Sequence, residues 1–408
     1  PSSHRNHFYA NAPQIVKGSM QFLYDDQGKE YLDFFAGVSV MNCGHCNPEI
    51  LEKTIQQMQT LQHTTIIYLT EEMVQLAEKL ASVLPGDLRR SFFCCTGSEA
   101  NEGAMLLARL YTGKNEFIAL ENGLHGRTYL TMSATGIPMW RADPDLSPKV
   151  HFAKTVWDSN TDLEQAAKAS IESIKEIIQT RGANHMAALI AEPIQGNGGI
   201  ITPPAWYFKE LKQLLEEHGI LLIIDEVQTG FARTGKMFAI EHYDVVPDIM
   251  TVAKALGNGM PISAFCTTDE VAKAFTKPSA STLGGNPVSS ATALAVLDYI
   301  EKYELCETAA HLGEMLKEGL IALQAKYSLI KDVRGIGLML GAELVKEDGQ
   351  PASEETDVIL EKLKDRGIIV GKNGLNRNVL AFQPPLVITE ANVQTLLHEL
   401  DEVLAELQ

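Results

Sequence analysis

Short apolar segments separated by helical patterns organise the middle of the chain. Each segment has the length of a fully buried strand. They lie at residues 92–95, 117–120, 187–190, 221–224, 249–252 and 262–266. Between them apolar residues recur at helical spacing, as at Ile171, Ile174 and Ile178. This alternation predicts an α/β fold with a mostly parallel sheet covered by helices on both faces.

The two ends of the chain have different patterns. Residues 17–37 alternate around Asp26-Gln27-Gly28, which predicts a hairpin. After about residue 290 come a long helical pattern, strand-like stretches and a last helix with one apolar face. Because neither end looks self-sufficient, we expect them to form one small α+β domain together. The predicted segments are 1–48 (small domain, N-terminal part), 49–290 (large domain) and 291–408 (small domain, C-terminal part).

A further helix is predicted from about residue 50. Its apolar residues Leu51, Ile55 and Met58 recur at three- and four-residue spacing and therefore share one face.

Composition and charge narrow the class of protein. The 408 residues include 34 basic and 52 acidic ones, a net charge of −18, which argues against nucleic acid or an anionic membrane as partner. No apolar stretch reaches the roughly 18 residues that span a bilayer. The first ten residues lack the apolar core of a signal peptide. We expect a cytoplasmic enzyme that acts on small molecules.

The six cysteines are too few and too scattered for a disulfide framework. Cys43 and Cys46 have the spacing of a dithiol redox site, but one such pair is half of a zinc site and no small redox domain surrounds it. We therefore expect buried or loop thiols and no metal.

Two charged residues end or follow predicted strands. Asp225 ends the segment at 221–224, and Lys254 follows the one at 249–252. Ligands of open α/β sheets bind outside the carboxyl ends of the strands, so both side chains are expected to face one pocket. Pyridoxal phosphate needs such a pair, a lysine for its Schiff base and an acid for its ring nitrogen. The alternative is a buried ion pair that closes two strands.

Glycine-containing loops surround the same predicted edge. Gly97 and Ser98 stand where a strand turns into a helix, and free amides at a helix start suit a phosphate. A capping box from Thr96 to Glu99 is the alternative, and both can hold together. Residues 230–236 match most of a P-loop, but Met237 replaces the Ser or Thr that would reach a metal, so a nucleotide-hydrolysing site is disfavoured.

Other candidates depend on loop position alone. Glu192 follows the strand at 187–190 and begins a loop rich in glycine, for which a plain turn is the alternative. His125 and Arg127 follow the strand at 117–120 and are otherwise solvated loop residues. Thr282 lies in a further glycine-rich loop before a helix.

In their order, these motifs resemble those of the class III pyridoxal-phosphate aminotransferases, the family of the 4-aminobutyrate, ornithine and alanine–glyoxylate enzymes. The resemblance covers nearly the whole chain. It is carried by Gly-His-x-x-Pro at 44–48, TGSEANE at 96–102, HGRT at 125–128, EPIQGNGG at 192–199, DEVQTGFARTG at 225–235, PDIMTVAKALGNGMP at 247–261, STLGGNP at 281–287 and FQPPLVIT at 382–389. It implies fold type I, with a seven-stranded sheet in the large domain.

The resemblance also implies a role for each matching residue. Lys254 would form the Schiff base and shuttle the substrate proton, and Asp225 would hold the pyridinium proton. The remaining cofactor contacts would come from Gln228 at the phenolic oxygen, Val227 at the ring face, Leu124 and His125 beside the ring, and Gly97 and Ser98 at the phosphate. Thr282 would reach the phosphate from the other subunit, which makes a homodimer necessary. The reaction would be a ping-pong transfer of nitrogen from an amine to a 2-oxo acid.

Two departures from the family pattern bear on the substrate. Leu124 stands where related enzymes have an aromatic residue, and Ala381 stands where they have an arginine that grips an α-carboxylate or pairs with the glutamate matching Glu192. Glu192 is thus expected to lack its usual partner, a costly state if it is buried and ionised. Arg127 remains, and resembles the residue that binds the distal carboxylate of ω-amino acids.

These departures leave several donors open. One hypothesis is an ω-amino acid held by Arg127, with pyruvate, glyoxylate or 2-oxoglutarate as acceptor and the first two favoured. A second is a diamine or amino sugar whose cation binds Glu192. A third is an amino-acid racemase or epimerase on the same scaffold. A catalytically silent binding protein is disfavoured by the presence of both Lys254 and Asp225.

Overall fold

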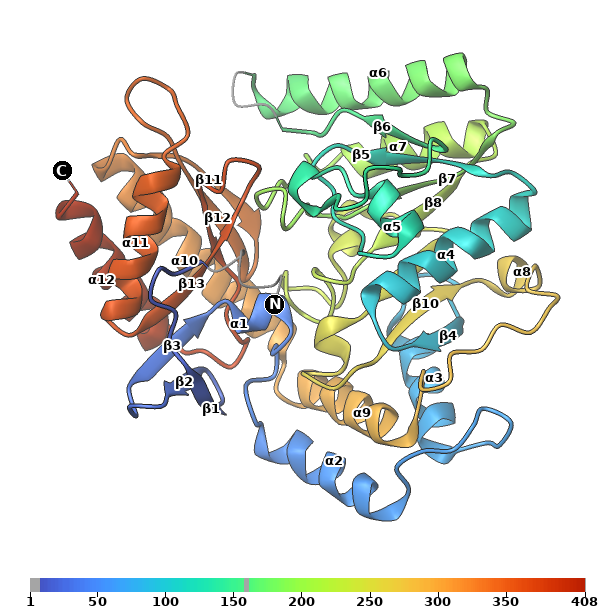
Figure 1. Cartoon of the computed structure of the whole chain (residues 1–408), viewed down its shortest axis with the longest axis horizontal. Coiled ribbons are helices and arrows are strands. Elements are labelled where there is room, and N and C mark those ends of the chain that lie inside the picture. Colours follow the sequence, from blue (N-terminus) through green and yellow to red (C-terminus); the bar gives the residue numbers. More distant parts are fainter. Residues whose placement is uncertain (1–7, 158–160, 408) are drawn as a thin grey trace.

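The computed structural model describes residues 8–157 and 161–407, and these form two seven-stranded sheets with helices packed on each (Figure 1). The larger half has the strand order β4-β10-β9-β8-β7-β5-β6. Its strands are β4 (Arg90–Cys94), β5 (Glu116–Leu120), β6 (Val150–Ala153), β7 (Met186–Ala191), β8 (Leu221–Asp225), β9 (Ile249–Val252) and β10 (Ser263–Thr267). Only β10 runs antiparallel to its neighbours among these strands, so the predicted mostly parallel sheet is confirmed.

Helices cover both faces of this sheet. Successive apolar residues of each strand point to opposite faces, so both faces are apolar and need to be covered. Ile190 and Ile223 pack with α4 (Gly97–Thr112) on one face. Leu222 and Ile224 belong to the cluster with α6 (Leu163–Arg181) and α7 (Tyr207–Glu217) on the other. The short helices α5 (Tyr129–Ala134) and α8 (Asp269–Ala272) lie beside α4. The parallel strands therefore direct their carboxyl ends to one shared edge.

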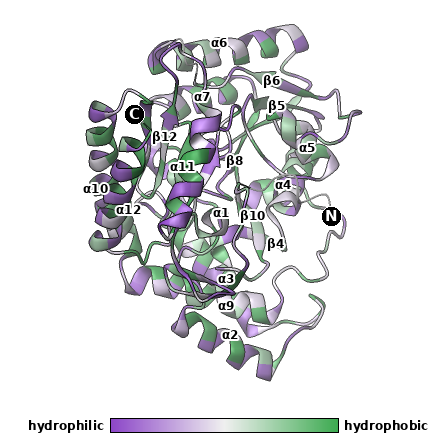
Figure 2. Ribbon diagram, turned by 60° about the vertical axis from the view of Figure 1, so that its left-hand side comes forward, coloured by the Kyte–Doolittle hydropathy of each residue, from purple (hydrophilic) through white to green (hydrophobic). Residues whose placement is uncertain are grey.

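The second sheet combines both ends of the chain. Its order is β1-β2-β3-β13-β14-β12-β11, with β3 parallel to β13. The strands are β1 (Ile15–Ser19), β2 (Phe22–Asp25), β3 (Glu30–Phe34), β11 (Ile330–Ile336), β12 (Met339–Leu344), β13 (Ile368–Asn373) and β14 (Val379–Phe382). The helices α10 (Leu305–Lys326), α11 (Ser353–Asp365) and α12 (Glu390–Ala405) pack beside it, and in Figure 2 they alternate hydrophilic and hydrophobic residues.

The course of α9 (Pro287–Lys302) bears on the predicted domain boundary at residue 290. That residue lies inside α9, which packs on α2 (Pro48–Thr60) and α3 (Glu71–Val83) rather than on the second sheet. We propose that the large domain extends to about Tyr303, where α9 ends.

The helix predicted near residue 50 is α2, but its most apolar face points outward. Leu51, Ile55 and Met58 are 43%, 45% and 46% exposed, whereas Ile50 and Thr54 are buried. The apolar stripe therefore covers no part of the core of this chain.

A left-handed turn connects β3 to the rest of the chain. Residues Ala36–Ser39 (α1) all have positive φ angles, between 49° and 67°, including the β-branched Val38. Such a turn costs L-residues about 1–2 kcal/mol each, so it needs local support. Asp33 provides it: one carboxylate oxygen accepts the amides of Phe35 and Ala36 at 2.8 and 2.9 Å, and the other pairs with His45 at 2.7 Å.

Cys43 is buried, which raises the pKa of its thiol, and Cys46 is exposed. Within residues 8–157 and 161–407, no group of three or more His, Cys, Asp or Glu is arranged to hold a metal ion. None of the helices in that part of the chain combines the length and apolar character needed to cross a bilayer.

Candidate active site

A cavity of about 340 Å³ lies at the carboxyl ends of the central strands of the sheet formed by β4–β10. It brings together most of the residues predicted from the sequence. These are Gly97, Ser98, Leu124, His125, Glu192, Asp225, Val227, Gln228 and Lys254. Val40, which follows the left-handed turn, also lines it. Arg127 and Thr282 are exposed and lie outside this lining.

Asp225, the last residue of β8, is held by three N–H donors. Its Oδ2 accepts from the side-chain amide of Asn101 at 2.7 Å and from Nδ1 of His125 at 2.8 Å. Its Oδ1 accepts from the amide of Val227 at 3.0 Å. The carboxylate is 3% exposed, so these donors replace the water that would otherwise stabilise its charge.

Lys254 follows β9 through Ala253 and starts the short 3₁₀ helix Lys254–Leu256, with a φ of 43°. Lys254 is of intermediate exposure and is one of the residues that line the cavity. Burial lowers the pKa of the amine, while the charges of Asp225 and Glu192 oppose this effect. Asp225 pairs with His125 rather than with Lys254, so the predicted alternative of an ion pair closing two strands is wrong. A lysine with a lowered pKa is suited to attack a carbonyl carbon.

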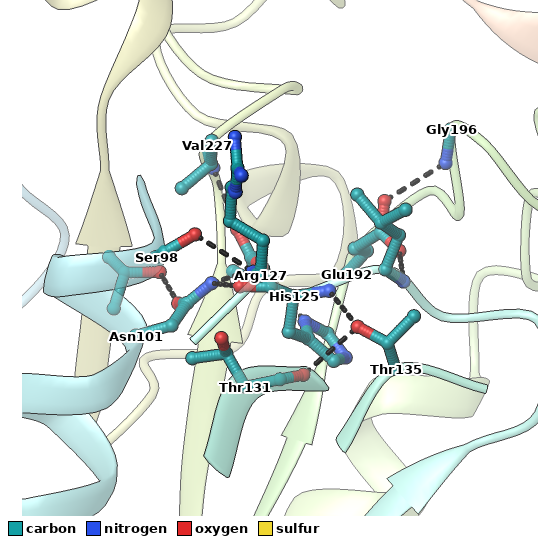
Figure 3. Close-up of polar contacts among 12 residues, drawn as sticks. Ser98, Asn101, His125, Arg127, Thr131, Thr135, Glu192, Gly196 and Val227 are labelled. Atoms are coloured by element: carbon teal, nitrogen blue, oxygen red, sulfur yellow. Dashed lines mark hydrogen bonds and ion pairs between the residues drawn. The ribbon is translucent and has the colours of Figure 1, made fainter. Parts of the chain in front are cut away.

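Glu192 directly follows β7 and is 4% exposed. Its carboxyl group accepts from the amide of Leu124 at 2.9 Å. It also accepts from the amide of Gly196 at 3.0 Å (Figure 3). Burial raises the pKa of this carboxyl to about 7, with His125 opposing and Asp225 adding to the shift. The group thus has two backbone donors in place of an arginine, and it changes charge near neutral pH.

The start of α4 leaves two amides free beside the cavity. Thr96 Oγ1 accepts from the Glu99 amide at 3.2 Å, which is one half of the predicted capping box. The Glu99 carboxylate accepts from the Cys95 amide at 2.9 Å rather than from that of Thr96, so the second half of the box is replaced by a bond to the preceding residue. The amides of Gly97 and Ser98 have no hydrogen-bond partner among the described residues and remain available to an anion.

A close approach of two loops completes this corner. The Arg127 amide donates to Ser98 Oγ at 3.1 Å (Figure 3). A Cβ at Gly126 would lie 2.6 Å from the same Oγ, and Gly126 has a φ of 148°, so glycine is needed here.

The lining residues fit pyridoxal phosphate, which carries a phosphate, a phenolic oxygen and a ring nitrogen. Gln228 Nε2 is buried in the cavity wall without a hydrogen-bond partner in the described part of the chain. A buried unpaired donor is costly, and an acceptor in the cavity would satisfy it. With the free amides of α4 at one side and the Asp225 carboxylate at another, the polar groups match those of the cofactor.

Ala381 lies in an apolar cluster beside the loop that follows Glu192. It is fully buried in β14 and packs with Ile194, Ile200 and Met339. Among the described residues that line the cavity there is no arginine. The arginine position of the family pattern is therefore filled by hydrocarbon.

The P-loop-like segment has a structural role instead. Arg233 is fully buried and donates to the carbonyls of Leu338 and Pro384 at 2.9 and 2.6 Å, and it also contacts Asn42. Burial lowers the pKa of its guanidinium to about 9. The segment thus connects the part of the chain after β8 to loops of the second sheet.

Sequence patterns missed two buried polar residues of the site. Asn101 lies on α4 and bonds to Asp225, and Thr251 on β9 donates to Asn101 Oδ1 at 2.6 Å. A threonine inside an apolar strand and an asparagine on the buried face of a helix are the signals by which they could have been found.

Comparison with known proteins adds independent information. A family model described as aminotransferase class-III matches residues 5–404. The chain is 44% identical to alanine–glyoxylate aminotransferase 2 homolog 2, mitochondrial, of Arabidopsis thaliana, over 96% of this chain and 83% of that protein. It is 39% identical to a leucine/methionine racemase of Thermococcus litoralis, over 96% of this chain and 90% of that one.

A solved structure is also similar. The crystal structure of an amine transaminase from an uncultivated Pseudomonas species in its PLP-bound form superposes with a TM-score of 0.93 at 30% identity. The match covers 100% of this chain and 96% of that one.

Proposed function

Because the chain belongs to the class III aminotransferases, whose cofactor is pyridoxal 5′-phosphate, we propose that it transfers an amino group from an ω-amino acid or related primary amine to a 2-oxo acid by a ping-pong mechanism. One observation carries the proposal: Lys254, Asp225 and the amino end of α4 line a single cavity. The bound cofactor supplies an electron sink for the carbanion formed at the substrate.

The residues of the chain divide the work. The amides of Gly97 and Ser98 bind the phosphate, and Asp225 holds the ring nitrogen. Gln228 donates to the phenolic oxygen, which satisfies its unpaired Nε2. Lys254 anchors the cofactor and then moves the proton at the substrate carbon that bears the amino group, for which its lowered pKa suits it.

Charge around the cavity favours particular substrates. Arg127, exposed outside the cavity lining, is proposed to bind the distal carboxylate of an ω-amino acid. Since Ala381 offers no cation, the clamp that related enzymes use for the α-carboxylate of glutamate is missing. Pyruvate or glyoxylate is therefore the preferred acceptor.

A homodimer is part of the proposal. Besides the apolar face of α2, four consecutive apolar residues, Ile66, Ile67, Tyr68 and Leu69, are 48%, 81%, 63% and 87% exposed, and exposed apolar surface of this kind is typical of interfaces. A second copy is proposed to cover these residues and to bring its Thr282 to the phosphate. The cytoplasmic location stays a prediction.

Two other candidates have specific support. Glu192, held without an arginine, has the charge to bind the cation of a diamine or amino sugar. The similarity to a leucine/methionine racemase favours amino-acid racemisation as a further possibility on this scaffold.

The test combines absorbance and turnover. Purified protein is expected to be yellow, to change colour on adding an amine donor and to recover on adding pyruvate, whereas Lys254→Ala abolishes turnover. A marked preference for 2-oxoglutarate would contradict the acceptor assignment. Incubating one enantiomer of an amino acid without any oxo acid separates the racemase, since inversion without nitrogen transfer would exclude an aminotransferase.

A further inference from the structure

Asn101 uses every hydrogen-bonding group of its side chain. Its amide nitrogen donates to Asp225 Oδ2 at 2.7 Å. The same nitrogen donates to the backbone carbonyl of His125 at 2.8 Å; Figure 3 labels Asn101 and His125. Its Oδ1 accepts from the Thr251 hydroxyl at 2.6 Å. Asn101 is 1% exposed and Thr251 is fully buried, so water does not compete for these bonds.

The chemistry of the partners fixes which way the amide points. A carboxylate and a carbonyl only accept hydrogen bonds, so the nitrogen of Asn101 faces Asp225 and His125. The oxygen then faces Thr251, which is paired with Asp225 across β8 and β9. If the hydroxyl were absent, the amide oxygen would be buried without a donor, which costs free energy.

The network also limits how Asp225 can be arranged. A carboxylate offers about four acceptor positions. Asn101 and His125 occupy two of them at Oδ2, and the Val227 amide occupies one at Oδ1. One position is left for a ligand in the cavity, and rotation of the carboxylate would break two or three bonds.

We propose that Asn101 is a positioning residue for the cofactor: oriented by Thr251, it fixes the Asp225 carboxylate so that its remaining acceptor position meets the ring nitrogen of pyridoxal phosphate. The inference rests on the proposed role of Asp225. A purely structural alternative exists, because Asn101 also ties α4 to the loop of His125. That alternative predicts losses that do not depend on the ring nitrogen.

The test uses the ring nitrogen as its probe. The dissociation constants of pyridoxal phosphate and of its 1-deaza analogue, in which carbon replaces the ring nitrogen, are measured with each cofactor-free protein. The wild type is expected to prefer pyridoxal phosphate. Asn101→Ala is expected to reduce this preference about tenfold, as for the loss of a hydrogen bond to a charged group. Equal weakening of both ligands would overturn the proposal.

Substitutions at Thr251 provide the second arm. Thr251→Val is expected to reduce the same preference severalfold, and Thr251→Ser, which keeps the hydroxyl, to restore it. Thr54→Val is the matched control: Thr54 is a buried threonine on α2 whose hydroxyl bonds to Thr292 and the Ile50 carbonyl, away from the cavity, so the preference stays unchanged. If Asn101→Ala does not fold, the Thr251 pair decides, and identical values for Val and Ser would overturn the inference.

Asp225→Asn separates the proposed role of Asp225 at the ring nitrogen from the proposed positioning role of Asn101. If it leaves the preference at the wild-type value, the role of Asp225 at the ring nitrogen is wrong. If it removes the preference while Asn101→Ala and Thr251→Val do not, the role of Asp225 survives and the role of Asn101 fails.

Discussion

The two sides of the cavity each carry a buried carboxyl group at a strand end, and they hold it differently. Asp225 is the last residue of β8 and Glu192 directly follows β7, and their positions are equivalent because Ile224 pairs with Ala191. Asp225 is held by two side chains and one amide, whereas Glu192 is held by two backbone amides. The three donors hold the Asp225 carboxylate in one orientation, which suits its proposed contact with the ring nitrogen. Glu192 is instead a group whose pKa of about 7 lets its charge change with conditions.

Removing the carboxylate of Asp225, on the β8 side of the cavity, is expected to lower the rate of amino transfer most. On its proposed role, Asp225→Ala takes away the partner of the ring nitrogen and leaves the donors of Asn101 and His125 unpaired, so the rate of amino transfer is expected to fall roughly 100- to 1000-fold. The half-reaction with excess amine, followed by absorbance, measures it. Asp248→Asn is the control, because this carboxylate lies before β9 at the opposite edge and bonds to Lys212 and the Leu222 amide. A similar loss in both variants would contradict the assignment.

Changing the β7 side is expected to affect some donors only. If Glu192 binds the distal cation of a diamine, Glu192→Gln lowers kcat/KM for that donor about 10- to 100-fold, the value of a charge-assisted hydrogen bond. A monoamine of equal length, which has no second charge, changes only a few fold. Equal losses for both donors would mean that Glu192 acts on the cofactor or the fold rather than on the substrate.

The preference between the two donors is expected to depend on pH through the ionisation of Glu192. The raised pKa of Glu192 means that the carboxyl is neutral below about pH 7 and charged above it. The ratio of kcat/KM for the diamine to that for the monoamine is therefore expected to rise about tenfold from pH 6 to pH 8, as the ionised fraction does. Taking the ratio cancels the titration of Lys254. The ratio should be flat in Glu192→Gln, and a rise that persists there would assign the titration to another group.

The smallest expected effect is on the affinity for pyridoxal phosphate, when Gly196 is changed. This residue contacts both Glu192 on the β7 side and Gln228 on the β8 side. The Gly196 amide donates to Glu192, and a Cβ at Gly196 would lie 2.0 Å from Gln228 Oε1. Gly196→Ala displaces the end of a flexible side chain, so the affinity for pyridoxal phosphate is expected to fall a few fold. Gly113→Ala, at a position with open space around it, controls for a general glycine effect, although its left-handed conformation reduces stability. Unchanged affinity in Gly196→Ala would mean that Gln228 does not contribute to binding.

The sequence was most informative where polar chemistry interrupts an apolar pattern at its end. Asp225, Glu192 and Lys254 each stand after a strand-like segment, and parallel strands necessarily bring such ends together. The structure brings all three to one cavity. The resemblance to class III aminotransferases, confirmed by the family match, supplied the cofactor.

The sequence was least informative where burial depends on tertiary partners. Thr251 and Asn101 are polar residues at buried positions of β9 and α4, which is a local signal, but the partners that they bond depend on how α4 packs against β8 and β9. The strand β6, VHFA, was missed because it is short and contains His151, which pairs with Glu116. The outward direction of Leu51, Ile55 and Met58 was hidden as well, because periodicity identifies a face but not what covers it.

The left-handed turn after β3 links cofactor retention to the integrity of the amino-terminal part of the chain. Val40 lines the cavity and directly follows the left-handed turn, so its position depends on that turn. The hydrogen bonds of Asp33 to the turn amides and to His45 stabilise the turn. Local opening of residues 33–45 therefore opens the cavity as well. Hydrogen exchange in this segment is then expected to slow when the cofactor binds, even though most of its amides lie outside the binding surface.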